Sequence, residues 1–191
     1  MLRQNLKKYV GYVFLAIAFP FAVPYHVTNN RGVFTTTGQL LSLLPGKVGS
    51  YLRSAYYSLT LKKCGKRLYV DFGSYFSQPA AEIHDDVFIS TFCIIGNAKI
   101  GNNVGISPCC HILSGGRQHA SFQKDVPIIW QSGGVLEQVS IGENSWIGQA
   151  SVVMADIGKQ NIIGAGSVVV KKTGDYEVHA GNPARLLRRL F

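Results

Sequence analysis

The sequence predicts an all-β solenoid preceded by an apolar, basic segment. From residue 83 onward, Ile and Val recur at steps of six residues. This period fits neither an amphipathic helix nor a strand of alternating polarity, but it does fit a short strand followed by a corner. Glycine is frequent, at 21 of 191 residues, and often follows the aliphatic residue, as tight corners require. The apolar fraction of 47% excludes a disordered chain, and the length suits one domain with an appendage.

Charge separates the first third of the chain from the rest. Residues 1–67 contain ten Lys and Arg residues and no acid, whereas residues 68–191 contain nine Lys and Arg residues and ten acids. The net charge of +9 therefore originates in the first third, which indicates an anionic partner. Because this region has no zinc finger, KH loop or RNP motif, we expect a membrane surface and no nucleic acid.

The apolar run 9–25 follows Arg3, Lys7 and Lys8. A signal peptide would need a small-residue cleavage site, and none follows the run. A membrane-spanning helix would be near its minimum length and bent by Pro20. A helix lying in the membrane interface and a helix packed on the main domain remain as alternatives. We expect a cytoplasmic protein of bacterial type, peripheral to the inner membrane or anchored there.

The stretch 40–68 continues this N-terminal segment. Pro45 and Gly46 mark a turn or a helix start, and apolar residues recur at helical spacing from Val48 onward. Several cations gather at the end of the stretch, partly as expected for a helix C-terminus. A basic, aromatic-rich amphipathic segment next to an apolar run favours contact with anionic lipid.

Three aliphatic series define the repeat, and one long interruption separates the first from the second. The series are Ile83, Ile89, Ile94 or Ile95, Ile100, Ile106 and Ile112; Val135, Ile141, Ile147 and Val153; and Ile157, Ile163 and Val169. The period stops over residues 115–134, which predicts an extruded loop, and such loops often carry function. We therefore divide the chain into an N-terminal segment (1–70), a solenoid (71–180) and a C-terminal tail (181–191).

Three motifs make the region 70–190 resemble the hexapeptide-repeat O-acetyltransferases of exopolysaccharide and capsule biosynthesis. They are Ser145-Trp146-Ile147-Gly148, Ile163-Gly164-Ala165-Gly166-Ser167-Val168-Val169 and Gly181-Asn182-Pro183-Ala184-Arg185. The resemblance implies a left-handed parallel β-helix, a homotrimer, acetyl-CoA as the donor and a saccharide as the acceptor. In this family the catalytic histidine lies at the start of the extruded loop.

Acyl transfer to a hydroxyl needs a base, and histidine suits that role because its pKa lies near neutrality. The resemblance points to His119 in the loop, with His111 as the weaker candidate. His26, His84 and His179 are expected to be structural or solvated. Related enzymes often place an Asn near the base, whereas this chain has Ser90-Thr91-Phe92 at the matching stretch. Another group, such as Asp125, would then orient His119.

The resemblance also assigns residues to CoA. Gly148, Gln149, Ala165 and Gly166 would line the pantetheine slot, and Lys171, Arg185 and Arg188 would meet the phosphates. The stretch around Arg185 fits a solvated basic tail or a short helix equally well. We expect no metal site, because the four cysteines form no CxxC pair, and we expect those thiols to be reduced.

The sequence analysis therefore predicts an acetyl-CoA-dependent O-acetyltransferase that acts on a saccharide by direct transfer. Its acceptor would be an exopolysaccharide, a capsule precursor or a lipid-linked sugar. Two other classes share features with the chain. A β-helix carbonic anhydrase would need three converging histidines around zinc. A non-enzymatic, membrane-bound scaffold would need no base at all.

Overall fold

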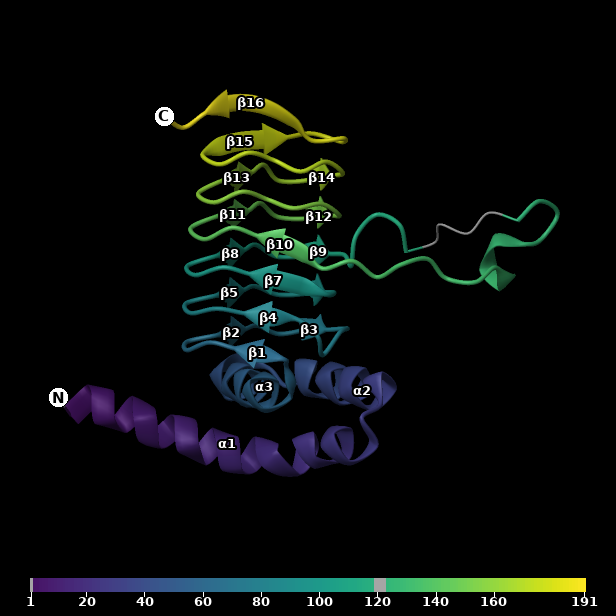
Figure 1. Cartoon of the computed structure of the whole chain (residues 1–191). Helices are drawn as coiled ribbons and strands as arrows, with labels where there is room; N and C mark the ends of the chain where they lie inside the picture. Colours follow the sequence, from purple (N-terminus) through teal and green to yellow (C-terminus); the bar gives the residue numbers. More distant parts are fainter. Residues whose placement is uncertain (1, 119–122) are drawn as a thin grey trace.

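A computed structural model describes residues 2–118 and 123–191, with side chains from Tyr9 onward. Three helices lie at one end of a parallel β-solenoid of about six turns (Figure 1). The helices are α1 (Leu2–Thr28), α2 (Arg31–Ser42) and α3 (Gly46–Thr60). This arrangement confirms the predicted solenoid and its helical extension.

Successive strands lie in order on the three sides of the solenoid. Strands that are one coil apart on the same side pair in parallel. Sheet A contains β1 (Lys63–Cys64), β4 (Glu82–Ile83), β7 (Ala98–Ile100) and β10 (Val139–Ile141). Sheet B contains β2 (Tyr69–Val70), β5 (Phe88–Ile89), β8 (Gly105–Ile106), β11 (Trp146–Ile147), β13 (Ile162–Ile163), β15 (Glu177–Ala180) and β16 (Arg185–Arg189). Sheet C contains β3 (Tyr75–Phe76), β6 (Ile94–Ile95), β9 (His111–Ile112), β12 (Val152–Val153) and β14 (Val168–Val169).

The six-residue period places one aliphatic side chain of each strand inside the solenoid. Ile100, Ile106 and Ile112 fill one turn from its three sides, and all three are fully buried. The first series continues through Ile95, whereas Ile94 faces outward and is only half-buried. The assignment of Val135 to the second series is wrong, because its side chain is 65% exposed in the loop. The ladder resumes only at β10.

The corners explain the frequent Gly, Asn and Asp residues. In sheets B and C, the residue three positions before the interior aliphatic adopts a left-handed conformation, as at Asp86 (φ 60°), Asn103 (φ 56°), Asn144 (φ 57°) and Gly166 (φ 67°). These residue types tolerate positive φ best. The next residue along points inward, and before the strands of sheet C it is small, as at the buried Cys93 and Cys110. All four cysteines are free thiols.

The helices close the N-terminal end of the solenoid with an aromatic cluster. The rings of Tyr57 in α3 and Phe76 in β3 lie 4.6 Å apart, and Tyr56 and Phe34 pack behind them. α1 lies across α3, where Phe14 stacks on Tyr51 with ring centroids 5.2 Å apart. Edge-to-face and stacked rings bury large apolar area at this end.

Arg53 is fully buried between α3, the end of α2 and the first turn. Its guanidinium donates to the carbonyl oxygens of Leu41 (2.9 Å), Leu44 (2.7 Å) and Val70 (3.1 Å). The last carbonyls of a helix have no partner within the helix, so a cation there is favourable. One of the ten N-terminal cations is therefore a structural residue.

Two further N-terminal cations pair with acids of the repeat. Lys62 lies 2.6 Å from Glu82, and Arg67 pairs with both carboxylate oxygens of Asp86 through its Nε and Nη2. The absence of acids before Asp71 thus does not leave all ten cations available to an external partner.

The C-terminal end of the solenoid is polar. Glu177 and His179 of β15 form a hydrogen-bonded pair at 2.8 Å, and Asn161 donates to Thr173 at 2.7 Å. Terminal repeats of solenoids commonly carry such polar caps. β16 then runs antiparallel to β15, so the segment around Arg185 is a strand and not the short helix weighed as an alternative.

A long loop joins β9 to β10 and extends away from the solenoid (Figure 1). Its far part contains a short 3-10 helix, Ile128–Trp130, whose three side chains are exposed.

Candidate functional site

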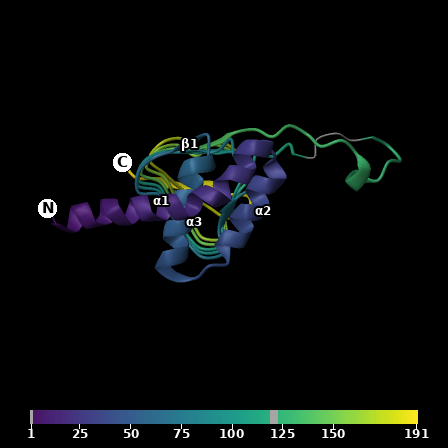
Figure 2. The same cartoon turned by 90° about the horizontal axis from the view of Figure 1, so that it is seen from below.

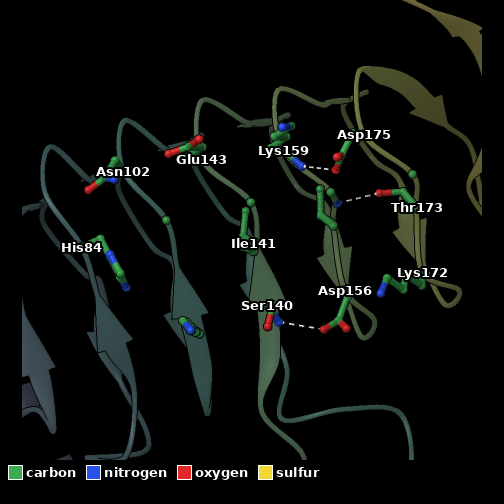
Figure 3. A pocket seen from close by; sticks show the side chains of 16 residues that line it. His84, Asn102, Ser140, Ile141, Glu143, Asp156, Lys159, Lys172, Thr173 and Asp175 are labelled. Carbon is green, nitrogen blue, oxygen red and sulfur yellow. Dashed lines mark hydrogen bonds between the residues drawn. The ribbon is translucent and has the colours of Figure 1, made fainter.

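A groove of about 770 Å³ runs along the corner between sheets A and B (Figure 3). It extends over successive turns, parallel to the solenoid axis. The lining residues are His84, Lys99, Gly101, Asn102, Ser140, Ile141, Gly142, Glu143, Asp156, Ile157, Gly158, Lys159, Lys172, Thr173, Gly174 and Asp175.

Glycines form part of the floor of this groove because the coils approach too closely for a side chain. A Cβ at Gly142 would lie 2.4 Å from the backbone nitrogen of Lys159, and one at Gly158 would lie 2.1 Å from the carbonyl oxygen of Gly174. Polar side chains stand on both sides, with Lys172 on the sheet A side and Glu143 on the corner side (Figure 3). The result is an open trench rich in hydrogen-bonding groups.

Some of the lining groups hold neighbouring coils together. Asp156 accepts a hydrogen bond from the backbone N–H of Ser140 at 2.8 Å, and Asp175 accepts one from Lys159 at 2.9 Å. By contrast, Lys99 and Lys172 form no ion pair within the described residues. These two amines are the groups of the trench best placed to meet an anionic or hydroxyl-rich ligand.

A second hollow of about 500 Å³ adjoins the trench at the root of the loop. It is lined in part by Gly115, Arg117 and Glu137, and it shares Asp156 and Lys172 with the trench. Arg117 pairs with Glu137, and the N–H of Glu137 donates to Ser114 at 3.0 Å. These contacts fasten the two ends of the loop beside the hollow.

The predicted base, His119, lies outside the described residues. His111 is half-buried on β9 between Ile94 and Val152, and it lines neither hollow. His84, expected to be structural or solvated, lines the trench, and its Nε2 lies 3.3 Å from Nζ of Lys63.

The structure brings four of the predicted CoA residues together at the corner between sheets B and C. The N–H of Gly166 donates to the carbonyl of Gln149 at 2.7 Å. A Cβ at Gly148 would lie 2.5 Å from the nitrogen of Ala165, so coil packing alone requires this glycine. Gln149, Ala165 and Gly166 are exposed.

The three predicted phosphate contacts lie elsewhere. Lys171 follows β14 and is exposed, and its neighbour Lys172 is the lysine that lines both hollows. Arg185 and Arg188 are exposed on β16, opposite Ala180 and Val178. Sequence reasoning missed the trench, although the recurrent Ile-Gly pairs mark its floor.

No group of three His, Cys, Asp or Glu side chains suited to a metal ion occurs in the part of the chain that the structure describes.

Comparison with known proteins finds acetyltransferases. No protein-family model matches the chain. The chain is 32% identical over 128 residues to the Saccharomyces cerevisiae protein YJL218W, whose name assigns it to the acetyltransferases; the match covers 64% of this chain and 60% of that protein. The chain thus spans less than two thirds of this relative. It is also 27% identical over 164 residues to chloramphenicol acetyltransferase of Agrobacterium fabrum, over 78% of this chain and 68% of that enzyme.

Solved structures share the fold. A maltose O-acetyltransferase from Clostridium difficile superimposes with a TM-score of 0.71 at 22% identity, over 83% of this chain and 85% of that one. A hexapeptide-repeat acetyltransferase from Vibrio cholerae gives 0.67 at 20% identity, over 84% and 93%. PerB from Caulobacter crescentus, solved with CoA and GDP-perosamine, gives 0.51 at 22% identity, over 66% and 51%. The chain therefore has the left-handed β-helix fold of these proteins.

Proposed function

We propose that this protein is an acetyl-CoA-dependent O-acetyltransferase that acts on a saccharide. One observation carries the proposal: a hexapeptide-repeat solenoid is interrupted by one long loop, and the root of that loop opens onto a polar trench. The sequence relatives are acetyltransferases by name, and the PerB structure binds both CoA and a sugar nucleotide. A shallow trench of charged and hydroxyl groups suits a hydroxyl-rich acceptor better than an acyl chain.

The proposed chemistry is direct transfer. The acceptor hydroxyl attacks the thioester carbonyl while a base takes its proton, and the CoA thiolate leaves and is protonated. We assign the role of the base to His119. General-base catalysis by this residue would raise the reaction rate by roughly 10²–10⁴-fold. Arg117 and Glu137 fasten the loop that carries this residue.

We propose that CoA binds along the corner between sheets B and C. The exposed residues Gln149, Ala165 and Gly166 would line the slot for the pantetheine arm, and Gly148 permits the coil spacing there. Lys171, Arg185 and Arg188 would meet the phosphates through charge-assisted hydrogen bonds. Their exposure at the C-terminal end of the solenoid supports this assignment.

We also propose a homotrimer, because two of the three faces of the solenoid are apolar. Sheet B exposes Phe88 (44%), Trp146 (52%) and Ile162 (39%) in one column, and sheet C presents mainly Ile and Val. Sheet A instead presents Lys, Ser and Asp. A ring of identical chains uses two different faces of each chain, as this distribution allows.

Residues 1–67 are proposed to hold the enzyme at the cytoplasmic face of the inner membrane, where a lipid-linked saccharide would be the acceptor. α1 carries this argument, since its stretch Tyr9–Thr28 is apolar and long enough to cross a membrane, yet only 11% buried. Equal activity on free and lipid-linked forms of one saccharide would remove the preference for a lipid-linked acceptor.

The test of the function is CoA release from acetyl-CoA with a panel of saccharide acceptors. We expect release to depend on the acceptor and to fall by roughly 10²–10⁴-fold in His119→Ala. His26→Ala is the matched control, because His26 lies in the N-terminal helices, where its ring contacts the carbonyl of Leu59 and the ring of Tyr25. Full activity in His119→Ala would refute the assignment of the base, and no release with any acceptor would refute the function.

A further inference from the structure

α1 carries an apolar face that no described residue covers. Its inner face packs on α3, where Ala18 and Ala22 are 0% and 1% exposed. The opposite side of the same helix presents large side chains to solvent. They are Tyr9 (68%), Tyr12 (66%), Val13 (56%), Ile17 (48%), Phe19 (59%) and Val27 (78%).

This outer face lacks the polar residues of an ordinary surface helix. No charged residue occurs between Tyr9 and Tyr25. A helix that is apolar on all sides belongs in a core or in a membrane. Further exposed apolar side chains lie on the end of α2 and the turn into α3, where Leu40, Leu43 and Val48 are each at least 64% exposed. Such a surface is larger than the scattered apolar side chains normal for a soluble monomer.

α1 runs across the N-terminal end of the solenoid and not along the solenoid axis (Figures 1 and 2). Contacts hold it along most of its apolar length. Phe14 stacks on Tyr51, Tyr25 lies 5.4 Å from the ring of Phe34, and His26 is 2.9 Å from the carbonyl of Leu59. Crossing a bilayer would require α1 to leave all of these partners.

The charge around this surface indicates what covers it. Lys7 and Lys8 precede the apolar stretch and Arg31 follows it, while residues 1–67 contain no acid. Arg31 and Lys47 are exposed. Anionic headgroups complement these cations. A second copy of the same surface would bring like charges together, which disfavours self-association.

We infer that α1 lies in the plane of an anionic membrane as a monotopic helix, with its outer face among the lipid tails. The solenoid then stands on the membrane by its N-terminal end, and the trench faces the aqueous side several coils above the bilayer. Under the proposed function, the saccharide part of a lipid-linked acceptor would reach the trench while its lipid stays in the bilayer. Membrane binding itself does not depend on that function.

Flotation of the full-length protein with vesicles tests this inference. The vesicles contain phosphatidylcholine alone or phosphatidylcholine with phosphatidylglycerol. We expect the wild type to float with the anionic vesicles and Tyr12→Glu/Val13→Glu to lose at least about 90% of that binding, because two charges would enter the lipid face. Leu187→Glu is the matched control, as Leu187 is 64% exposed at the opposite end of the solenoid. Unchanged thermal unfolding of both variants shows that they fold.

The orientation is tested by protease added outside preformed vesicles that carry bound protein with an N-terminal epitope. An in-plane helix leaves the epitope outside, where it is cleaved, and a spanning helix protects it. Protection of the epitope would overturn the inference, and so would equal flotation of the double variant. It would also be overturned if the wild type did not bind vesicles but formed an oligomer that the double variant could not form. His119→Ala must float like the wild type, so a failure of catalysis is distinguishable from a failure of membrane binding.

Discussion

Replacing Arg53 by Met tests how the helices are joined to the solenoid. The guanidinium is fully buried and donates to three backbone carbonyls within 3.1 Å, those of Leu41, Leu44 and Val70. Met fills a similar volume but donates nothing, so these carbonyls would lose their buried partner. Burial lowers the pKa of the Arg53 guanidinium, and the nearby charge of Asp71 opposes that effect.

The expected loss of stability follows from these contacts. A buried acceptor left without a partner costs about 1–3 kcal/mol, and this applies to the carbonyls of Leu44 and Val70. The carbonyl of Leu41 keeps a hydrogen bond from the N–H of Leu44 at 3.3 Å. Removing the cation also relieves its desolvation, which offsets part of the loss. We therefore expect Arg53→Met to lower the free energy of unfolding by about 3–5 kcal/mol, or the Tm by about 10 °C.

Urea unfolding followed by circular dichroism measures this difference. Lys47→Met is the matched control, since Lys47 is exposed at the start of α3 and should change stability by less than about 0.5 kcal/mol. If Arg53→Met proved as stable as Lys47→Met, the helical cap would be held by its aromatic cluster alone, and the role assigned to Arg53 would be wrong.

Three further outcomes are expected. The hydrogen bond from His179 holds the pKa of Glu177 below its usual range, so this pair should stabilise the fold above the ordinary glutamate pKa of about 4.3 and lose that contribution as the pH falls below it. In a plot of Tm against pH, Glu177→Gln should therefore reduce the fall of Tm at acid pH. An unchanged fall would show that the pair does not contribute. A thiol reagent should label Cys109 quickly in the folded protein, because Cys93 and Cys110 are buried and burial raises the pKa of Cys64 to about 11; rapid labelling of all four thiols would contradict the core. Gly142→Ala should destabilise the solenoid by about 2 kcal/mol or more in thermal melts, because its Cβ would lie 2.4 Å from a backbone nitrogen, whereas an unchanged Tm would contradict the coil spacing.

The repeat was predictable from sequence because every turn of the solenoid imposes the same three demands. In sheets B and C, an aliphatic such as Ile106 must point inward, the residue two positions before it, here Val104, must also be buried, and Asn103 must take the left-handed corner one position earlier. In the loop, where these requirements do not apply, the prediction from the sequence was wrong. Val135 has the right chemistry and the right spacing but lies in the loop, since spacing alone does not show where pairing resumes.

The roles of the N-terminal cations were the feature that was hardest to predict from the sequence. Arg53, Lys62 and Arg67 count equally toward the basic N-terminal third, yet one is a buried cap and two pair with acids of the repeat. The acids that pair with Lys62 and Arg67 lie 20 and 19 residues away in the chain, and the partners of Arg53 are backbone carbonyls, so neither kind of partner is visible in composition. The trench was missed for a similar reason, because glycines spaced for coil packing also leave a floor without side chains.

The most direct test of the proposed function is the identity of the product. Wild-type protein, acetyl-CoA and a saccharide acceptor are incubated, and the saccharide is analysed by mass spectrometry before and after mild alkali. We predict the gain of one acetyl group that alkali removes, as expected for an ester, and its loss in His119→Ala. An alkali-stable acetyl amide, or an acetyl ester formed equally well by His119→Ala, would contradict the account.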